Sequence, residues 1–353
     1  MNQVNKTKFM LSEDYKSDGI MLAWPSIYEN EIYWLDLLRV YYEIIKNCLV
    51  FNKNIVLIIQ KGRDIKDDLR LVDEDITNII KAKGELLQLY EIDYNDIWMR
   101  DYCPLTLINE SNNKYYFNIA SFNGYGNKYA CDKDKVLSLK FIKKYQDQNN
   151  RYQKEYFEIF NDLIIEPGNI TFDKNLIIMN KTPLLLHNDL DWKSINNILK
   201  NGIEDFLGVR YEIINVKPID GDDTSGHIDN LIRLENTNYL YYMATNDSKH
   251  PDYKLLMNLR DQIMRINFVN KKIIPIYHDH HDVVRDSENN ILPFSYLNYI
   301  RIGDLIIMPI NKNTSIYKKN RIKRIFEYAD VIFIEISCLL HERGGLHCCS
   351  MNI

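Results

Sequence analysis

The sequence predicts an α/β protein that forms a single domain over residues 1–353. Three observations predict this fold class. Segments with the pattern of buried strands alternate with segments that have the apolar period of amphipathic helices. No stretch rich in Pro, Gly and Ser is long enough to separate two domains. Polar motifs also recur at nearly constant steps along the chain, as repeated structural units would place them.

The alternation begins at residues 19–25, an apolar stretch closed by Pro25 that predicts a buried strand. Residues 29–47 follow with apolar side chains at helical spacing and predict an amphipathic helix. The later elements repeat this order. We expect further strands at 54–60, 86–90, 176–179, 211–216, 230–234, 239–243, 273–277, 305–309 and 331–336. We expect further helices at 64–83, 136–145, 192–206, 253–269 and 317–328.

The composition is that of a globular protein, because 46% hydrophobic and 26% charged residues allow a sizeable core. The net charge of −5 argues against a nucleic-acid partner and suits a cationic ligand. Residues 1–18 lack the apolar segment of a signal peptide, and no run of eighteen apolar residues occurs, so we expect a cytoplasmic protein without a membrane partner. The six cysteines have no CxxC spacing, which predicts reduced thiols.

Cys348 follows a Gly-Gly pair in the stretch 344–353 and is the candidate nucleophile. A sulfur attacks only as a thiolate, so it needs nearby positive charge or a base, together with groups that hold an electrophilic carbon close to it. Cys349 is the alternative nucleophile. Neighbours on a strand point to opposite faces, so only one of the two thiols can enter a site.

Three further polar motifs lie upstream of Cys348, at residues 95–101, 166–169 and 222–229. Their candidate residues are Asp101, Glu166, His227 and Asp229. Asp101 and Glu166 are 65 residues apart, and Glu166 and His227 are 61 residues apart. The interval from His227 to Cys348 is 121 residues, which is close to twice as long. Units of this length around a shared axis would deliver all these residues to one central pit. The missing position of the series falls near 289–298.

Several acids beside a thiol repel one another and raise the pKa of the thiol unless a cation lies among them. This points to a guanidinium substrate, which is planar, permanently positive and matches two carboxylates in a bidentate way. Held in that way, its central carbon stays open to the sulfur. With His227 as proton donor and then as base, and with Glu166 nearby, the predicted reaction is hydrolytic removal of an imino group.

Residues 98–101 (Trp-Met-Arg-Asp), 226–229 (Gly-His-Ile-Asp) and 345–348 (Gly-Leu-His-Cys) resemble the signature motifs of the agmatine deiminase branch of the guanidino-group-modifying enzymes. The resemblance extends from 21–25 to the C-terminus and includes 122–126 (Phe-Asn-Gly-Tyr-Gly). It implies a five-bladed α/β propeller with pseudo-fivefold repeats around a central active site. It also implies no metal and no other cofactor.

The resemblance further implies a reaction and a set of roles. Agmatine and water would give N-carbamoylputrescine and ammonia through a thiouronium on the cysteine, and a homo-oligomer is compatible with the family. By matching motif, the implied roles are Cys348 as nucleophile, Asp101 and Asp229 as the guanidinium clamp, His227 and Glu166 as the acid/base pair, Trp98 as a wall of the site, and Asp223 as the acid for the distal amine.

The chain departs from the family pattern at Pro167 and Cys103, where glycine is usual. Proline biases the preceding Glu166 toward extended geometry and could shift it. The alternatives are therefore a deiminase of another guanidine, such as free or peptidyl arginine, and a catalytically silent guanidine-binding protein.

A metal hydrolase would use the cluster at 278–282, but such close neighbours converge poorly, so we expect a solvated loop there. Taken singly, each residue also has a structural explanation, such as Asp223 capping a turn.

Overall fold

The computed structural model describes residues 8–10, 13, 17–25, 32–73, 76–109, 112–160, 162–235, 238–268 and 270–353. Strands and helices alternate through this part of the chain, so the α/β class is confirmed. The described strands form five sheets of three or four strands and one two-stranded hairpin.

Four of the five larger sheets share one order of strands. A first strand pairs antiparallel with a central strand, and a third strand pairs parallel with that central strand. The four sets are β5 (Leu105–Asn109), β6 (Lys114–Asn118) and β7 (Tyr152–Phe157); β8 (Ile170–Phe172), β9 (Leu176–Asn180) and β10 (Arg210–Ile214); β11 (Ile232–Glu235), β12 (Tyr239–Ala244) and β13 (Lys272–Tyr277); and β16 (Ile300–Ile302), β17 (Leu305–Ile310) and β18 (Asp330–Glu335). β1 (Lys8–Met10) adds an antiparallel strand to β5.

A helical connection joins the central strand of each of these sheets to its parallel partner, because parallel neighbours need a crossover. The helices are α6 (Asp134–Gln148); α7 (Lys181–Leu186) with α8 (Trp192–Leu199) and the π-helical turn η3 (Lys200–Leu207); α9 (Tyr253–Arg265); and α10 (Ile316–Ile325).

The fifth sheet combines both ends of the chain. Its strands β2 (Gly19–Ala23), β3 (Asn54–Ile59) and β4 (Leu87–Glu91) are parallel, and β19 (Ser350–Asn352) pairs antiparallel with β2. Helix α1 (Trp34–Val50) connects β2 to β3, and α2 (Ile65–Arg70), α3 (Ile76–Lys83) and η1 (Gly84–Leu86) connect β3 to β4. Because β19 begins at Ser350, this pairing anchors the stretch that carries Cys348.

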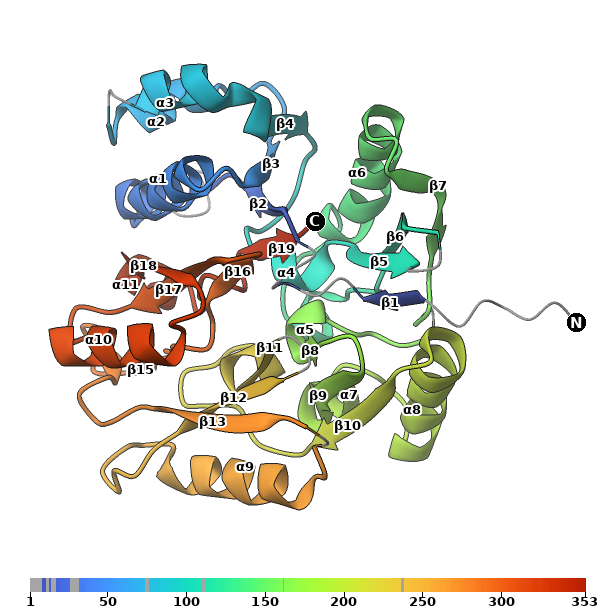
Figure 1. Cartoon of the computed structure of the whole chain (residues 1–353), viewed down its shortest axis with the longest axis vertical. Coiled ribbons are helices and arrows are strands. Elements are labelled where there is room, and N and C mark those ends of the chain that lie inside the picture. Colours follow the sequence, from blue (N-terminus) through green and yellow to red (C-terminus); the bar gives the residue numbers. More distant parts are fainter. Residues whose placement is uncertain are drawn as a thin grey trace, which may run out of the picture.

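Figure 1 shows how these units are arranged. Helices α1, α6, α8, α9 and α10 lie around the outside, while β19 and the C-terminus lie near the middle. Short elements occupy the connections. They are α4 (Met99–Tyr102), α5 (Gly124–Asn127), η2 (Pro167–Asn169), η4 (Ile228–Asn230), α11 (Ser337–His341), and the hairpin strands β14 (Val284–Arg285) and β15 (Ile291–Leu292).

The core packs against both faces of the sheets. In β2, Ile20 and Leu22 belong to one cluster of buried side chains, and Met21 and Ala23 belong to a second cluster. A strand buried on both faces is a continuous apolar run rather than an alternating one, which is why residues 19–25 could be predicted as a strand. In the described part of the chain, every helix is too short or too polar to cross a bilayer.

Several predicted elements differ from the structure. The helix expected at 64–83 is divided into α2 and α3, with residues 74–75 outside the described part. The helix expected at 29–47 begins at Trp34 and ends at Val50, and residues 29–31 lie outside the described part. Strands β5, β6 and β7 were missed. In β7 the charged residues Lys154 and Glu155 interrupt the apolar pattern, because this strand is largely exposed.

Candidate active site

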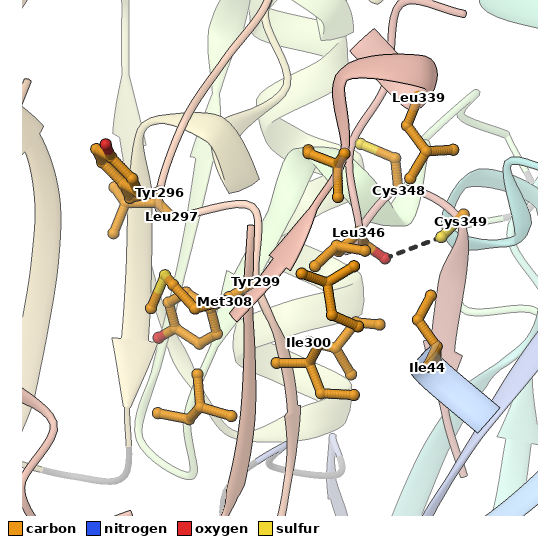
Figure 2. Packing of buried hydrophobic residues seen from close by; sticks show 14 of the residues in the cluster. Ile44, Tyr296, Leu297, Tyr299, Ile300, Met308, Leu339, Leu346, Cys348 and Cys349 are labelled. Atoms are coloured by element: carbon orange, nitrogen blue, oxygen red, sulfur yellow. Dashed lines mark hydrogen bonds between the residues drawn. The ribbon is translucent and has the colours of Figure 1, made fainter. Parts of the chain in front are cut away.

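Cys348 and Cys349 lie in a turn just before β19, and their sulfurs have different surroundings. Cys348 lines a cavity of about 230 Å³. The Sγ of Cys349 is fully buried and donates to the carbonyl oxygen of Leu346 at 3.2 Å, as the dashed line in Figure 2 shows. The two sulfurs therefore diverge as predicted, although in a turn rather than on a strand. Only Cys348 faces the cavity within the described structure.

Asn298 holds the turn that carries Cys348. Its Nδ2 donates to the Sγ of Cys348 at 3.2 Å. Its Oδ1 accepts from the backbone N–H groups of His347 at 2.9 Å and Cys348 at 3.4 Å. Asn298 lies at the end of the interval 289–298, where the motif spacing placed a missing position. Sequence reasoning named the interval but not this residue.

Asp101 lies on α4 and lines the same cavity. Its Oδ2 accepts from the hydroxyl of Tyr125 at 2.9 Å, and its Oδ1 accepts from the backbone N–H of Gly168 at 3.1 Å. Burial raises the pKa of Asp101 to about 6, with Glu166 adding to the rise and the positive charge of His227 opposing it. At neutral pH the carboxyl group is therefore ionised.

The side chains of Glu166 and His227 meet behind Asp101. His227 Nε2 lies 2.9 Å from Glu166 Oε2, and His227 Nδ1 lies 3.5 Å from Asp101 Oδ1. Burial acts to lower the pKa of His227, but the carboxylates of Asp101 and Glu166 raise it to about 10. Burial likewise acts against ionisation of Glu166, yet hydrogen bonds from His187 and His227 hold its pKa below the usual value. At neutral pH the site therefore contains a histidine cation between two carboxylates.

Pro167 does not move Glu166 out of the site. The backbone of Glu166 is extended, with φ −88° and ψ 124°, as a residue before proline prefers. Pro167 and Gly168 then form the short helix η2, and the N–H of Gly168 reaches Asp101. Cys103, the other departure from the family pattern, is buried beside Met99, 3.6 Å from sulfur to sulfur.

Asp229 joins Cys348 to a buried charge network. Its Oδ2 lies 2.7 Å from His347 Nδ1 and 3.8 Å from the Sγ of Cys348. His347 Nε2 lies 3.0 Å from Glu13, which also pairs with Arg100 at 3.1 Å and with Arg233. Burial opposes ionisation of Asp229, but the hydrogen bond from His347 lowers its pKa.

The thiol of Cys348 is neutral in this environment. Burial raises its pKa well above the usual value, and the carboxylates of Asp229 and Asp101 raise it further. A bound cation would reverse the effect of these carboxylates, because opposite charge near a thiolate stabilises it. The site therefore favours a cationic ligand over a neutral or anionic one.

Trp98 and Asp223 also line the cavity. The ring of Trp98 packs on Gly344, where an added Cβ would lie 2.2 Å from Cζ3. Asp223 Oδ2 accepts from the hydroxyl of Tyr129 at 2.5 Å, and Lys128 pairs with Oδ1. The acid expected for a distal amine is thus already paired with a lysine that the sequence prediction did not include.

The sequence prediction also missed several other contacts. Tyr125 belongs to the motif at 122–126 and His347 precedes the candidate nucleophile, so both carried a signal. His187 and Glu13 carried none, because neither lies in a motif and each reaches the site only through the tertiary fold.

Among the described residues, those at 278–282 included, no three His, Cys, Asp or Glu side chains are placed to hold a metal ion. The solvated loop expected there is partly wrong. His278 is buried, and its Nε2 accepts from the backbone N–H of Tyr296 at 3.1 Å. Asp282 is buried and pairs with Lys318 at 2.8 Å. His280 and His281 are exposed, and the side chain of Asp279 is half-exposed.

Comparison with known proteins finds a matching family and relatives whose names agree with it. The profile of the family described as Porphyromonas-type peptidyl-arginine deiminase matches residues 9–353. A Legionella pneumophila (strain Paris) protein, provisionally named agmatine deiminase, is 23% identical over 349 residues, covering 96% of this chain and 93% of that protein.

Solved structures share the fold. A protein provisionally called a peptidyl-arginine deiminase superposes with a TM-score of 0.82 at 22% identity, covering 98% of both chains. A Cys-to-Ser variant of C. jejuni agmatine deiminase with substrate bound has a TM-score of 0.81 at 20% identity, covering 100% of this chain and 98% of that one.

Proposed function

Because the chain belongs to the Porphyromonas-type peptidyl-arginine deiminase family, we propose that it hydrolyses the imino group of a guanidine, with agmatine as substrate. The family and the named relatives support deimination of a guanidino group in general. The choice of agmatine rests on the names of distant relatives and on the acid Asp223 in the cavity.

One observation carries the proposal. Asp229 Oδ1 and Glu166 Oε1 are buried carboxylate oxygens that have no hydrogen-bond partner within the described structure. Buried polar atoms are rarely left in this state, because each one costs about 1–3 kcal/mol when unpaired. A guanidinium carries five N–H donors when one nitrogen is substituted, and it would satisfy these oxygens while neutralising the acids around Cys348.

In the first half of the proposed reaction, the guanidinium binds between Asp101 and Asp229. The added positive charge lowers the pKa of the Cys348 thiol, which loses its proton to water; this proton later converts the released ammonia to ammonium. The thiolate then bonds to the guanidinium carbon to form a neutral tetrahedral centre. His227, a cation at neutral pH, gives a proton to one amino group, and the C–N bond breaks to release ammonia. The product on Cys348 is a thiouronium cation.

In the second half, water attacks the thiouronium carbon. Neutral His227 takes a proton from the water, with the carboxylate of Glu166 stabilising the imidazolium that forms. The tetrahedral centre collapses, the C–S bond breaks, and the sulfur leaves as a thiolate. The hydroxyl proton of the departing group passes to this thiolate, which restores the thiol and leaves a neutral urea, so agmatine would give N-carbamoylputrescine. The net reaction consumes one water and releases ammonium.

The same family relationship leads us to propose that residues 1–353 form one catalytic domain with five blades. Each of the five larger sheets has an antiparallel outer pair and a parallel pair joined by a helix, which is the regularity that five repeats would produce. In this proposal β19 completes the blade begun by β2. The cytoplasmic location stays a prediction.

A second candidate substrate is a guanidine that carries a carboxylate, such as arginine. Lys128 pairs with Asp223 beside the cavity, so an anion and a cation stand together at the place where the distal end of a substrate would lie. An α-amino acid presents the complementary pair of charges, whereas agmatine presents only an amine.

Activity measurements on the purified chain test the proposal. We expect ammonia and a ureido product from agmatine, at a rate well above that from arginine. Cys348→Ala should abolish turnover, and Cys349→Ala, which alters a buried sulfur outside the cavity, should retain it. A protein that binds agmatine tightly but releases no ammonia would refute the enzymatic function. Preferred turnover of arginine would instead support the second candidate.

A further inference from the structure

We propose that His187 is a positioning residue for Glu166, an inference that rests on the proposed acid/base role of Glu166 and His227. His187 Nδ1 lies 2.9 Å from Glu166 Oε2, the same oxygen that His227 Nε2 approaches at 2.9 Å. Two imidazoles therefore hold one carboxylate oxygen. Both rings are almost completely excluded from solvent, with side-chain exposures of 4% and 0%.

The hydrogen bonds define which nitrogen of each ring keeps its proton. Glu166 is ionised and can only accept, so each ring must direct an N–H at Oε2. His187 then carries its proton on Nδ1, and its Nε2 can accept from the hydroxyl of Ser225, 3.2 Å away. His227 carries a proton on Nε2, which leaves Nδ1 as the nitrogen that exchanges a proton during the reaction. His187 thereby helps to select the reactive nitrogen of His227.

The surroundings of His187 restrict its ring. Asn123 Nδ2 donates to the backbone carbonyl of His187 at 3.1 Å. Gly126, with φ 76°, passes so close that an added Cβ would lie 3.2 Å from His187 Cδ2. Both residues lie in the segment between β6 and α6. This segment therefore contacts the backbone and one side of the ring of His187, while Ser225 contacts the ring at Nε2.

The two carboxylate oxygens of Glu166 therefore have different surroundings. Oε2 is occupied by two histidines, whereas Oε1 has no partner in the described structure. With the carboxylate held at one oxygen by two rings, Oε1 is kept in one orientation and can accept from a substrate N–H or from the hydrolytic water. Loss of His187 would let the carboxylate rotate about its remaining contact with His227.

Loss of His187 should also be visible in the pH profile. The titratable groups that act on Glu166 are His187 and His227, and Asp101 and Tyr125 lie within its electrostatic influence. The hydrogen bond from His187 favours the ionised carboxylate. Its removal should therefore raise the pKa of Glu166 and move the acid limb of kcat to higher pH.

Two substitutions of His187 test whether the position of its donor nitrogen, rather than the size of its side chain, supports Glu166. In His187→Asn, the amide nitrogen lies where Nδ1 lies and can still donate to Glu166. In His187→Gln, the longer side chain is closer to histidine in length but carries its amide nitrogen at the position of Nε2, toward Ser225. We expect His187→Asn to keep kcat within about threefold and His187→Gln to lose at least tenfold, with KM changing less than kcat. The acid limb should move only in the glutamine variant.

His250→Gln is a matched control, because His250 is a buried histidine whose Nδ1 accepts from the backbone N–H of Asp252 at 3.1 Å. It should leave the acid limb of kcat where it is in the unsubstituted protein. Equal activity of the two His187 variants, or better activity of the glutamine variant, would overturn the inference.

Nitrogen-15 NMR of the histidines in the substrate-free protein tests the same inference without turnover. We expect the resonances of the His227 ring to change in His187→Gln and to stay in place in His187→Asn. If the unsubstituted protein releases no ammonia from either guanidine, the proposed function fails, and the NMR result alone decides the positioning role. Unchanged His227 resonances in both variants would refute it.

Discussion

In the proposed reaction, the charge states of Asp101 and His227 set the pH range of activity. Asp101, with a pKa raised to about 6, would have to be ionised to bind a guanidinium. His227, with a pKa raised to about 10, would have to be protonated to release ammonia. We therefore predict a bell-shaped profile of kcat/KM that falls below about pH 6 and above about pH 10, measured by ammonia release across pH 4–11.

Tyr125 allows a test of the assignment of the acid limb to Asp101. Its hydroxyl donates to Asp101 Oδ2 and favours the ionised carboxyl group. Tyr125→Phe should therefore move the acid limb of kcat/KM to higher pH and leave the basic limb in place. A basic limb that moves instead would contradict the assignment of the limbs.

Lys128 is the residue that separates the two candidate substrates. If the amine of agmatine binds Asp223, Lys128 competes with it, and Lys128→Gln should lower KM for agmatine by about 1.5- to 5-fold, the range expected of a partly exposed ion pair. Initial rates with agmatine and arginine measure the change. A raised KM for arginine with no change for agmatine would favour the second candidate.

At the residue scale, most of the site could be predicted from the sequence. Asp101, Glu166 and His227 lie in direct contact, and Asp229 lies 3.8 Å from the sulfur of Cys348. Their catalytic roles remain predictions. His187 and Glu13 could not be predicted, because their importance depends on which distant side chains they meet and neither stands in a recognisable motif.

At the scale of elements, the turn before β19 controls the position of Cys348. Gly344 packs on the ring of Trp98, and an added Cβ would overlap Cζ3 at 2.2 Å. We predict that Gly344→Ala lowers activity at least tenfold and destabilises the protein by about 1–3 kcal/mol, as overpacking does. Gly84→Ala is the matched control, because an added Cβ there meets nothing within 4 Å.

Activity assays and urea unfolding of both glycine variants check this prediction. The control should stay within about 0.5 kcal/mol of the unsubstituted protein. Full activity of Gly344→Ala would show that the turn can shift without moving the sulfur of Cys348, and would contradict the account of this element.

The elements that could be predicted are those buried on both faces, such as β2 and β17, which appear in the sequence as uninterrupted apolar runs. β7 escaped prediction because its exposed residues Lys154 and Glu155 interrupt the apolar pattern. β19 escaped prediction because it has only three residues and its identity as a strand depends on pairing with β2 across the length of the chain.

At the scale of the whole molecule, Glu13 ties distant parts of the chain together. It contacts Arg100, Arg233 and His347, which come from three separate segments behind the site. Both guanidinium groups are buried, with side-chain exposures of 2% for Arg100 and 3% for Arg233. Glu13→Gln removes the negative charge that compensates them, so we predict a loss of about 3–5 kcal/mol in the free energy of unfolding.

Denaturant unfolding measures this loss. Glu43→Gln is the control, because Glu43 pairs with Lys46 at 3.6 Å on the surface and should change stability by no more than about 1 kcal/mol. Equal stability of the two variants would mean that Glu13 does not compensate the buried arginines.

In the proposed reaction, a guanidinium carbon becomes bonded to the sulfur of Cys348. The most direct test is mass spectrometry of the full chain after reaction with a haloacetamidine, which mimics the guanidinium and traps the nucleophile. We predict one adduct per chain, mapped by peptide digestion to Cys348 and suppressed by excess agmatine. An adduct on Cys349, or none on Cys348 in a protein that still releases ammonia from agmatine, would contradict the account.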